Sequence, residues 1–137
     1  LSISLYFLVF SLIAIFKYFQ FGYNGLDLAI YNQVFFNSAH GRLFQFTIHP
    51  QSYLGDHFEL FILALLPLYA IFKHPLSLLI IQSLALALSA LPLYLIAKKL
   101  LASPWPIFIA LAWLINPFIQ NTNLFEFTAP DIGPMPG

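Results

Sequence analysis

The chain has 137 residues, of which 61% are hydrophobic, 18% are aromatic and only 7% are charged. A soluble domain has charges on roughly a quarter of its residues, so this composition, with a mean hydropathy of +0.86, excludes a soluble protein and predicts that the chain lies in a lipid bilayer. Zero net charge and the absence of cysteine exclude a basic nucleic-acid surface, disulfides and thiolate metal sites.

Three apolar segments are predicted to cross the membrane, at about residues 1–21, 76–97 and 104–120. Each approaches the roughly 20 residues that a crossing helix needs. The basic pair Lys98 and Lys99 closes the second span, and basic residues favour the cytoplasmic side. The sequence therefore predicts an all-α, multi-pass membrane protein. The chain starts inside an apolar run without Met, so we expect residues 1–137 to be a single N-terminal part of a larger polytopic domain.

The apolar segment 60–72 has 13 residues and contains Pro67. At 1.5 Å per residue it covers about two thirds of a hydrocarbon core of roughly 30 Å, which favours a re-entrant or interfacial helix. Residues 22–75 would then form one outer loop with surface helices, on the same side as the outer loop 121–137. If the segment crosses instead, the acidic residues are divided between the two sides. The positive-inside rule favours the first arrangement, with the acidic loops outside the plasma membrane.

A surface helix is predicted from Leu26 to about His40, with Gly41 as its C-terminal stop. Asp27 would lie in its first turn, where the helix dipole stabilises a carboxylate. That structural role is one interpretation of Asp27, and a role as general base is the other.

The same helix carries two polar stripes. Such a helix suits the membrane surface better than a lipid-facing position, with one stripe directed toward a cavity. The first stripe consists of Asp27, Tyr31 and Ser38, and the second of Gln33, Asn37 and His40.

Three side chains that can bind metal or transfer protons, Asp56, His57 and Glu59, lie just before the short apolar segment. Asp56 with Glu59 three residues later also resembles a capping box, which would need no further function. His57 is not needed for a cap, so it is the residue that argues for a site. A divalent cation is the cofactor that this group would hold.

Acidic residues also follow the last span. Glu126 lies between Phe125 and Phe127, and apolar surroundings would raise the pKa of its carboxyl. Asp131 follows in the same loop, and both acids fit a solvated interfacial loop equally well. Arg42 either grips a lipid phosphate or is a solvated charge.

Five segments of the chain resemble domain-of-unknown-function family 2079, which comprises predicted integral membrane proteins of bacteria and archaea. These segments are 25–33, 40–44, 53–58, 91–94 and 123–127. That family is in turn similar to the GT-C glycosyltransferases. The resemblance implies a GT-C-like N-terminal helical bundle with three transmembrane helices and amphipathic or re-entrant helices in the first outer loop.

The resemblance also implies site residues. GT-C enzymes place an acidic residue in the first outer loop, commonly with a tyrosine four residues later, and Asp27 and Tyr31 match that spacing. Asp27-Leu28 departs from the tandem Asp-Glu common there.

The site implied on this chain is the set Asp27, Tyr31, Asp56, His57, Glu59 and Glu126, with Arg42 and Asp131 at the phosphate of a polyprenyl-phosphate-linked sugar. The function implied is sugar transfer on the outer face of the membrane, although this part of the chain alone is expected to be inactive. The alternatives are a membrane transporter or flippase, and a non-catalytic assembly protein with the same fold.

Overall fold

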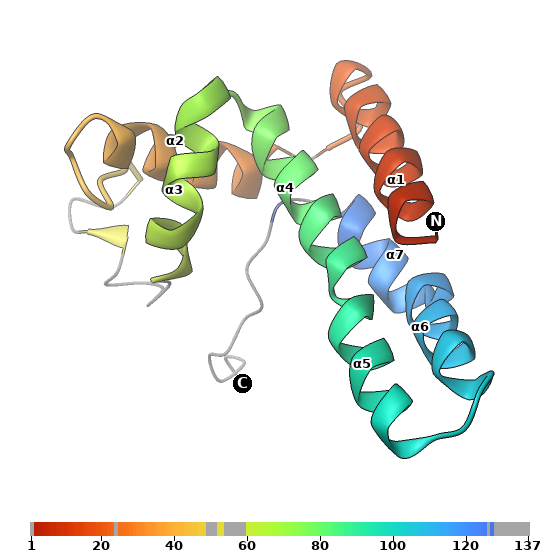
Figure 1. Cartoon of the computed structure of the whole chain (residues 1–137). Helices are drawn as coiled ribbons and strands as arrows, with labels where there is room; N and C mark the ends of the chain where they lie inside the picture. The colour runs from red at the N-terminus through yellow and green to blue at the C-terminus, as the bar shows by residue number, and fades with distance from the viewer. Residues whose placement is uncertain (1, 24, 49–51, 54–59, 126, 128–137) are drawn as a thin grey trace, which may run out of the picture.

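The computed structural model describes residues 2–23, 25–48, 52–53, 60–125 and 127, and within these ranges it contains helices and no strand (Figure 1). The prediction of an all-α protein is therefore confirmed for this part of the chain. The helices are α1 (Ser2–Phe19), α2 (Leu26–Ala39), α3 (Phe61–Phe72), α4 (Pro75–Leu88), α5 (Ala90–Leu100), α6 (Trp105–Ile115) and α7 (Pro117–Leu124).

Two helical segments are long and apolar enough to cross a membrane: α1, with 18 residues, and the continuous run of α4 and α5 over Pro75–Leu100, with 26 residues. At 1.5 Å per residue these lengths correspond to about 27 and 39 Å. Helix α1 packs along α4, and α6 packs along α5, so each half of the long α4–α5 segment has one main partner (Figure 1).

The second predicted span is one helical run, in which Ser89 (φ −62°, ψ −20°) joins α4 to α5. Pro92 accounts for the division into two helices because it has no N–H to donate to the carbonyl of Leu88 four residues earlier. The Ser89 hydroxyl donates to the Leu86 carbonyl oxygen (2.6 Å) and accepts from Trp113 Nε1 (2.7 Å). The junction of α4 and α5 is thus held by a side chain from α6.

The third predicted span, 104–120, is not one continuous helix. Asn116 separates α6 from α7 and has extended backbone angles (φ −57°, ψ 121°), as expected for a residue before proline. Its Oδ1 accepts from the backbone N–H of Phe118 (2.9 Å), which makes Asn116 the N-cap of α7. Helix α6 alone has 11 residues, about 16 Å, and is too short to cross.

Helices α2 and α3 form a separate group at the start of α4, at the opposite end from the turn between α5 and α6 (Figure 1). Helix α2 runs across the end of α4 instead of along it. A hydrophobic core joins the three helices and the end of α1, and its fully buried members include Val34, Phe35, Ile62, Tyr69 and Leu78. A second core, around Tyr6, Phe10, Ala87 and Leu114, joins α1 to α4, α5 and α6.

The short apolar segment 60–72 is helical, as predicted, over the 12 residues of α3. Its length of about 18 Å is little more than half of a hydrocarbon core. Lys73 ends the helix in the left-handed conformation (φ 48°), and α4 starts at once, with His74 as N-cap and Pro75 as its first residue. This tight turn keeps α3 against α2 and the beginning of α4.

Candidate functional site

Helix α2 presents the two residues on which the predicted site is centred, Asp27 and Tyr31. The helix starts after Gly25, whose φ of 82° is a conformation that residues with a Cβ rarely adopt. Asp27 lies in the first turn and is half-buried. Tyr31 is one turn later on the same side of the helix, as the four-residue spacing requires, and it is buried.

The C-terminal end of α2 confirms the predicted stop at Gly41. The N–H of Gly41 donates to the Ser38 carbonyl (3.1 Å), and the N–H of Arg42 donates to the Asn37 carbonyl (2.9 Å). With Gly41 at φ 81°, this is a Schellman motif. Arg42 therefore has a fixed backbone position directly after the helix, and it is exposed.

The second polar stripe of α2 holds the following loop. Asn37 Nδ2 donates to the Gln45 carbonyl oxygen (2.8 Å), and Gln33 Oε1 accepts from both the N–H and the hydroxyl of Thr47 (both 3.1 Å). These side chains are used to fix residues 44–47 against the helix. Their role is structural, and a ligand is not needed to explain them.

Two members of the first stripe are packed in the interior of the protein. Ser38 is buried, and its hydroxyl accepts from the N–H of Phe44 (3.0 Å). Tyr31 is packed among aromatic rings in the core. The loop after α2 thus folds back onto the helix at Ser38, which helical periodicity cannot reveal.

Tyr31 brings together two distant parts of the chain. Its ring lies 5.0 Å from the ring of Phe127 and 5.7 Å from the ring of Tyr53, measured between centroids. Phe127 also contacts Phe35, at 6.2 Å. The face of α2 that carries Tyr31 is therefore where the loop between α2 and α3 meets the chain after α7.

Most of the other predicted site residues lie outside the described part of the chain: these are Asp56, His57, Glu59, Glu126 and Asp131. Tyr53 and Phe127, which flank the two groups in sequence, are described. Among the described residues, no group of three or more His, Asp or Glu side chains could hold a metal ion.

Tyr69 joins α3 to α2 by a hydrogen bond that sequence analysis did not anticipate. Its hydroxyl donates to Asn32 Oδ1 (2.7 Å), and its ring lies 5.2 Å from that of Phe35. Burial raises the pKa of the Tyr69 hydroxyl, so the group stays protonated and remains a donor at physiological pH.

Replacing Tyr69 by Phe removes this bond while keeping the ring. We expect a loss of about 1 kcal/mol in the free energy of unfolding, the usual net contribution of one hydrogen bond. Denaturant titration of the purified protein in detergent measures it. Tyr94→Phe is the matched control, since its hydroxyl has no hydrogen bond to any residue in the described part of the chain. An equal loss in both variants would contradict the role of the bond.

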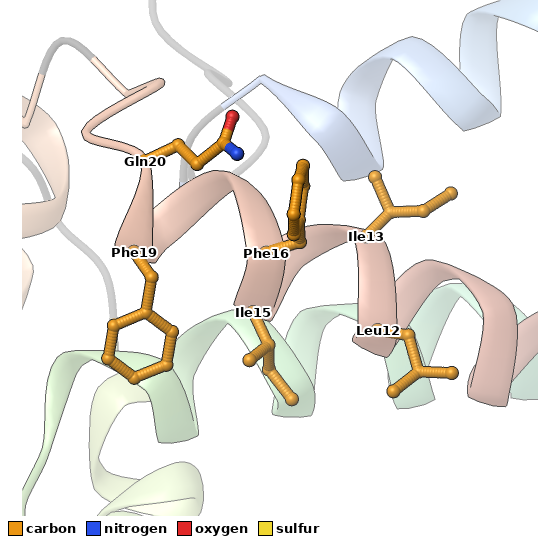
Figure 2. A pocket seen from close by; sticks show the side chains of 6 residues that line it. All are labelled: Leu12, Ile13, Ile15, Phe16, Phe19 and Gln20. Atoms are coloured by element: carbon orange, nitrogen blue, oxygen red, sulfur yellow. The ribbon is translucent and has the colours of Figure 1, made fainter.

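A shallow hollow with a volume of about 720 Å³ lies on the outer side of α1 (Figure 2). Its lining side chains come from α1 and from Gln20, the residue directly after it, and only Gln20 is polar. They are Leu12, Ile13, Ile15, Phe16, Phe19 and Gln20. It contains no titratable group and is separate from Asp27, so it is a lipid-compatible face and not a candidate for chemistry.

Polar contacts join α7 to the two long apolar segments, and the sequence pattern does not predict them. Ser83 Oγ donates to Asn123 Oδ1 (2.8 Å), Asn123 Nδ2 donates to the Tyr6 hydroxyl (3.3 Å), and all three residues are buried. Ser83 and Tyr6 lie within apolar segments of the sequence. The available signal was Asn116 followed by Pro117, which marks a new helix with the polar sequence of 120–123 on it.

The family model described as "Predicted membrane protein (DUF2079)" matches residues 17–132. No curated protein and no solved structure matches the chain.

Proposed function

This chain belongs to the DUF2079 family of predicted membrane proteins, and from that premise we propose that it is part of a membrane glycosyltransferase-like protein. The donor would be a polyprenyl-phosphate-linked sugar, and transfer would take place on the outer face of the membrane. The observation that carries the proposal is the convergence on one face of α2. Asp27 and Tyr31 share that face, and Tyr53 and Phe127 reach it from the two loops that hold the other candidate acids.

The proposed reaction needs few groups from the protein. The oxygen of an acceptor hydroxyl attacks the anomeric carbon, and the bond from that carbon to the phosphate oxygen breaks. The polyprenyl phosphate leaves with the electron pair, and Asp27 takes the proton of the hydroxyl as general base. Such assistance contributes roughly 10²- to 10⁴-fold in rate.

The other candidate residues have supporting roles in the proposal. Asp56, His57 and Glu59 would hold a divalent cation or orient the leaving phosphate, and Glu126 would add a second acidic group. Arg42 is exposed directly after α2, where a guanidinium suits bidentate binding of a phosphate. Asp131 would lie near the same phosphate.

The proposal requires that α2 and the end of α7 lie on one side of a plasma membrane, with α3 not crossing. The 12-residue length of α3 and the position of α2 across the end of α4 support this arrangement (Figure 1). Lys98 and Lys99, in the last turn of α5, would then be cytoplasmic.

Cysteine labelling tests this topology, because the chain contains no cysteine of its own. Single cysteines are placed at Leu43, Ser103 and Phe125, all of which are exposed, in the complete protein in intact cells. We expect an impermeant maleimide to label positions 43 and 125 and to label position 103 only after the cells are broken. Labelling of 43 and 125 from opposite sides would exclude the glycosyltransferase-like arrangement.

A specific observation favours transport as a second candidate function. The last turn of α1 and the start of α4 lie together, where Tyr18 contacts His74. Ser11 is eight residues before the end of α1, and Ser83 is eight residues after the start of α4, so each lies about 12 Å along its helix from this point. The Ser11 hydroxyl is buried and has no hydrogen-bond partner among the described residues. Buried polar groups at such depth, beside interrupted helices, are typical of transporters. Uptake or flipping by proteoliposomes, without sugar transfer, would favour this alternative.

A further inference from the structure

The end of α7 is held by side chains from both long apolar segments. Three consecutive residues, 122–124, each take part in a hydrogen bond to α1 or α4. The Thr122 carbonyl accepts from Gln82 Nε2 (2.8 Å), and the Asn123 side chain bonds to Ser83. The Leu124 carbonyl accepts from Lys17 Nζ (2.5 Å). We call Lys17, Gln82, Ser83 and Asn123 the α7 clamp.

Lys17 lies in a site built for an ammonium group. It is in the last turn of α1, and its Nζ reaches the carbonyl of Leu124, the last residue of α7. The charge is therefore at the C-terminal ends of two helices, where the helix dipole favours a cation. Nζ also lies 4.4 Å from the centroid of the Tyr23 ring, within the range of a cation–π interaction.

Gly22 provides the space for this lysine. A Cβ at position 22 would lie 2.7 Å from Lys17 Cγ, closer than real Cβ contacts allow. The backbone N–H of Gly22 donates to the Lys17 carbonyl oxygen (2.9 Å). The turn after α1 is thus shaped around the Lys17 side chain, which must reach α7 in a defined direction.

The clamp acts on a helix that apolar packing alone would not orient. Between lipid-exposed helices there is no hydrophobic driving force, so polar contacts select among rotations and sliding positions. Helix α7 has eight residues and a mostly polar sequence after Pro117. Phe127 follows Leu124 by three residues and lies on Tyr31 of α2, so the position of α7 determines where the chain meets α2.

We infer that the residues of the α7 clamp are positioning residues, which hold the chain after α7 against the face of α2 that carries Asp27 and Tyr31. The importance of these residues for catalysis rests on the proposed function, because only a reaction would require the two loops to lie close together. The positioning itself is a property of the fold and is measurable without any activity.

The test uses a cysteine pair in place of Tyr31 and Phe127 in the complete protein, cross-linked in membranes by a short bifunctional methanethiosulfonate. Lys17→Met keeps the aliphatic stem and removes the donor, and Asn123→Leu removes the contact to Ser83. We expect each to reduce the cross-linking yield at least fivefold. Lys17→Arg keeps a cationic donor and is expected to restore at least half of the yield. Trp113→Phe is the matched control, since it removes a bond between α6 and Ser89, away from residues 122–124.

The two readouts separate the inference from the proposed function. Unchanged cross-linking in Lys17→Met and Asn123→Leu, or equal loss in Trp113→Phe, would overturn the positioning role. Reduced cross-linking together with no sugar transfer by the unmodified protein would support the positioning role and reject the glycosyltransferase proposal. If transfer is present, Lys17→Met without the cysteine pair should lower kcat at least tenfold, with recovery in Lys17→Arg.

Discussion

Replacing Asp27 by Asn is expected to reduce sugar transfer by the complete protein by roughly 10²- to 10⁴-fold, the range over which general-base assistance contributes. Asparagine has nearly the same shape as aspartate but cannot accept the proton of the acceptor hydroxyl. Asp27 is half-buried in the first turn of α2, so the substitution leaves the core intact. The measurement is transfer from undecaprenyl-phosphate hexoses and pentoses by membranes that contain equal amounts of each variant.

Two variants separate the proton transfer from a structural role in the helix. Asp27→Glu keeps a carboxylate and should retain measurable activity, whereas Ala29→Asn places the same amide on an exposed position of α2 and should be fully active. Loss of the interaction between the Asp27 carboxylate and the dipole of α2 costs only about 0.3–1 kcal/mol of helix stability, so the expression level should not change. Full transfer by Asp27→Asn would rule out Asp27 as the base.

Replacing Phe35 by Ala is expected to lower the free energy of unfolding by about 3–5 kcal/mol, as for other fully buried aromatic residues. Phe35 has no exposed surface and packs between Tyr69 of α3 and Phe127. The cavity would loosen the attachment of α3 and of the chain after α7 to α2. Titration with a denaturing detergent, monitored by circular dichroism, measures the loss.

The neighbouring Phe36 provides the matched control. It has the same side chain in the same helix but is 41% exposed, and its ring contacts only His40 among the described rings, at 4.3 Å. Phe36→Ala should cost no more than about 1.5 kcal/mol, the upper value for one aromatic pair. Equal losses for the two variants would mean that the core around Phe35 does not form as described.

Local signals in the sequence were sufficient for the class of the protein and for the ends of several helices. Gly41 ends α2 as predicted, since its φ of 81° is a conformation that favours glycine. The short helix α3 was also predicted within one residue, because the apolar run and its flanking turn residues define it. These features depend on neighbours in the chain, so they are visible without a tertiary structure.

The interrupted spans were visible in the sequence but were not predicted. Asn116 before Pro117 has the pattern of an N-cap and a first helical residue, yet the apolar composition of 104–120 suggested one continuous helix. Pro92 similarly predicts the division between α4 and α5 at Ser89. Hydropathy alone reveals neither position, because it measures composition and not the backbone hydrogen bonds.

By itself, the sequence determined that this is a helical membrane protein, placed its apolar segments, and identified Asp27 and Tyr31 as neighbours on one helix. Only the tertiary structure decided which distant segments meet on that helix and that Lys17 reaches the end of α7. The reason is physical. Helical periodicity and capping are set by residues within about four positions of one another in the chain. The contacts of Phe127 with Tyr31 and of Lys17 with Leu124 join residues about 100 positions apart. Such contacts depend on how whole helices pack.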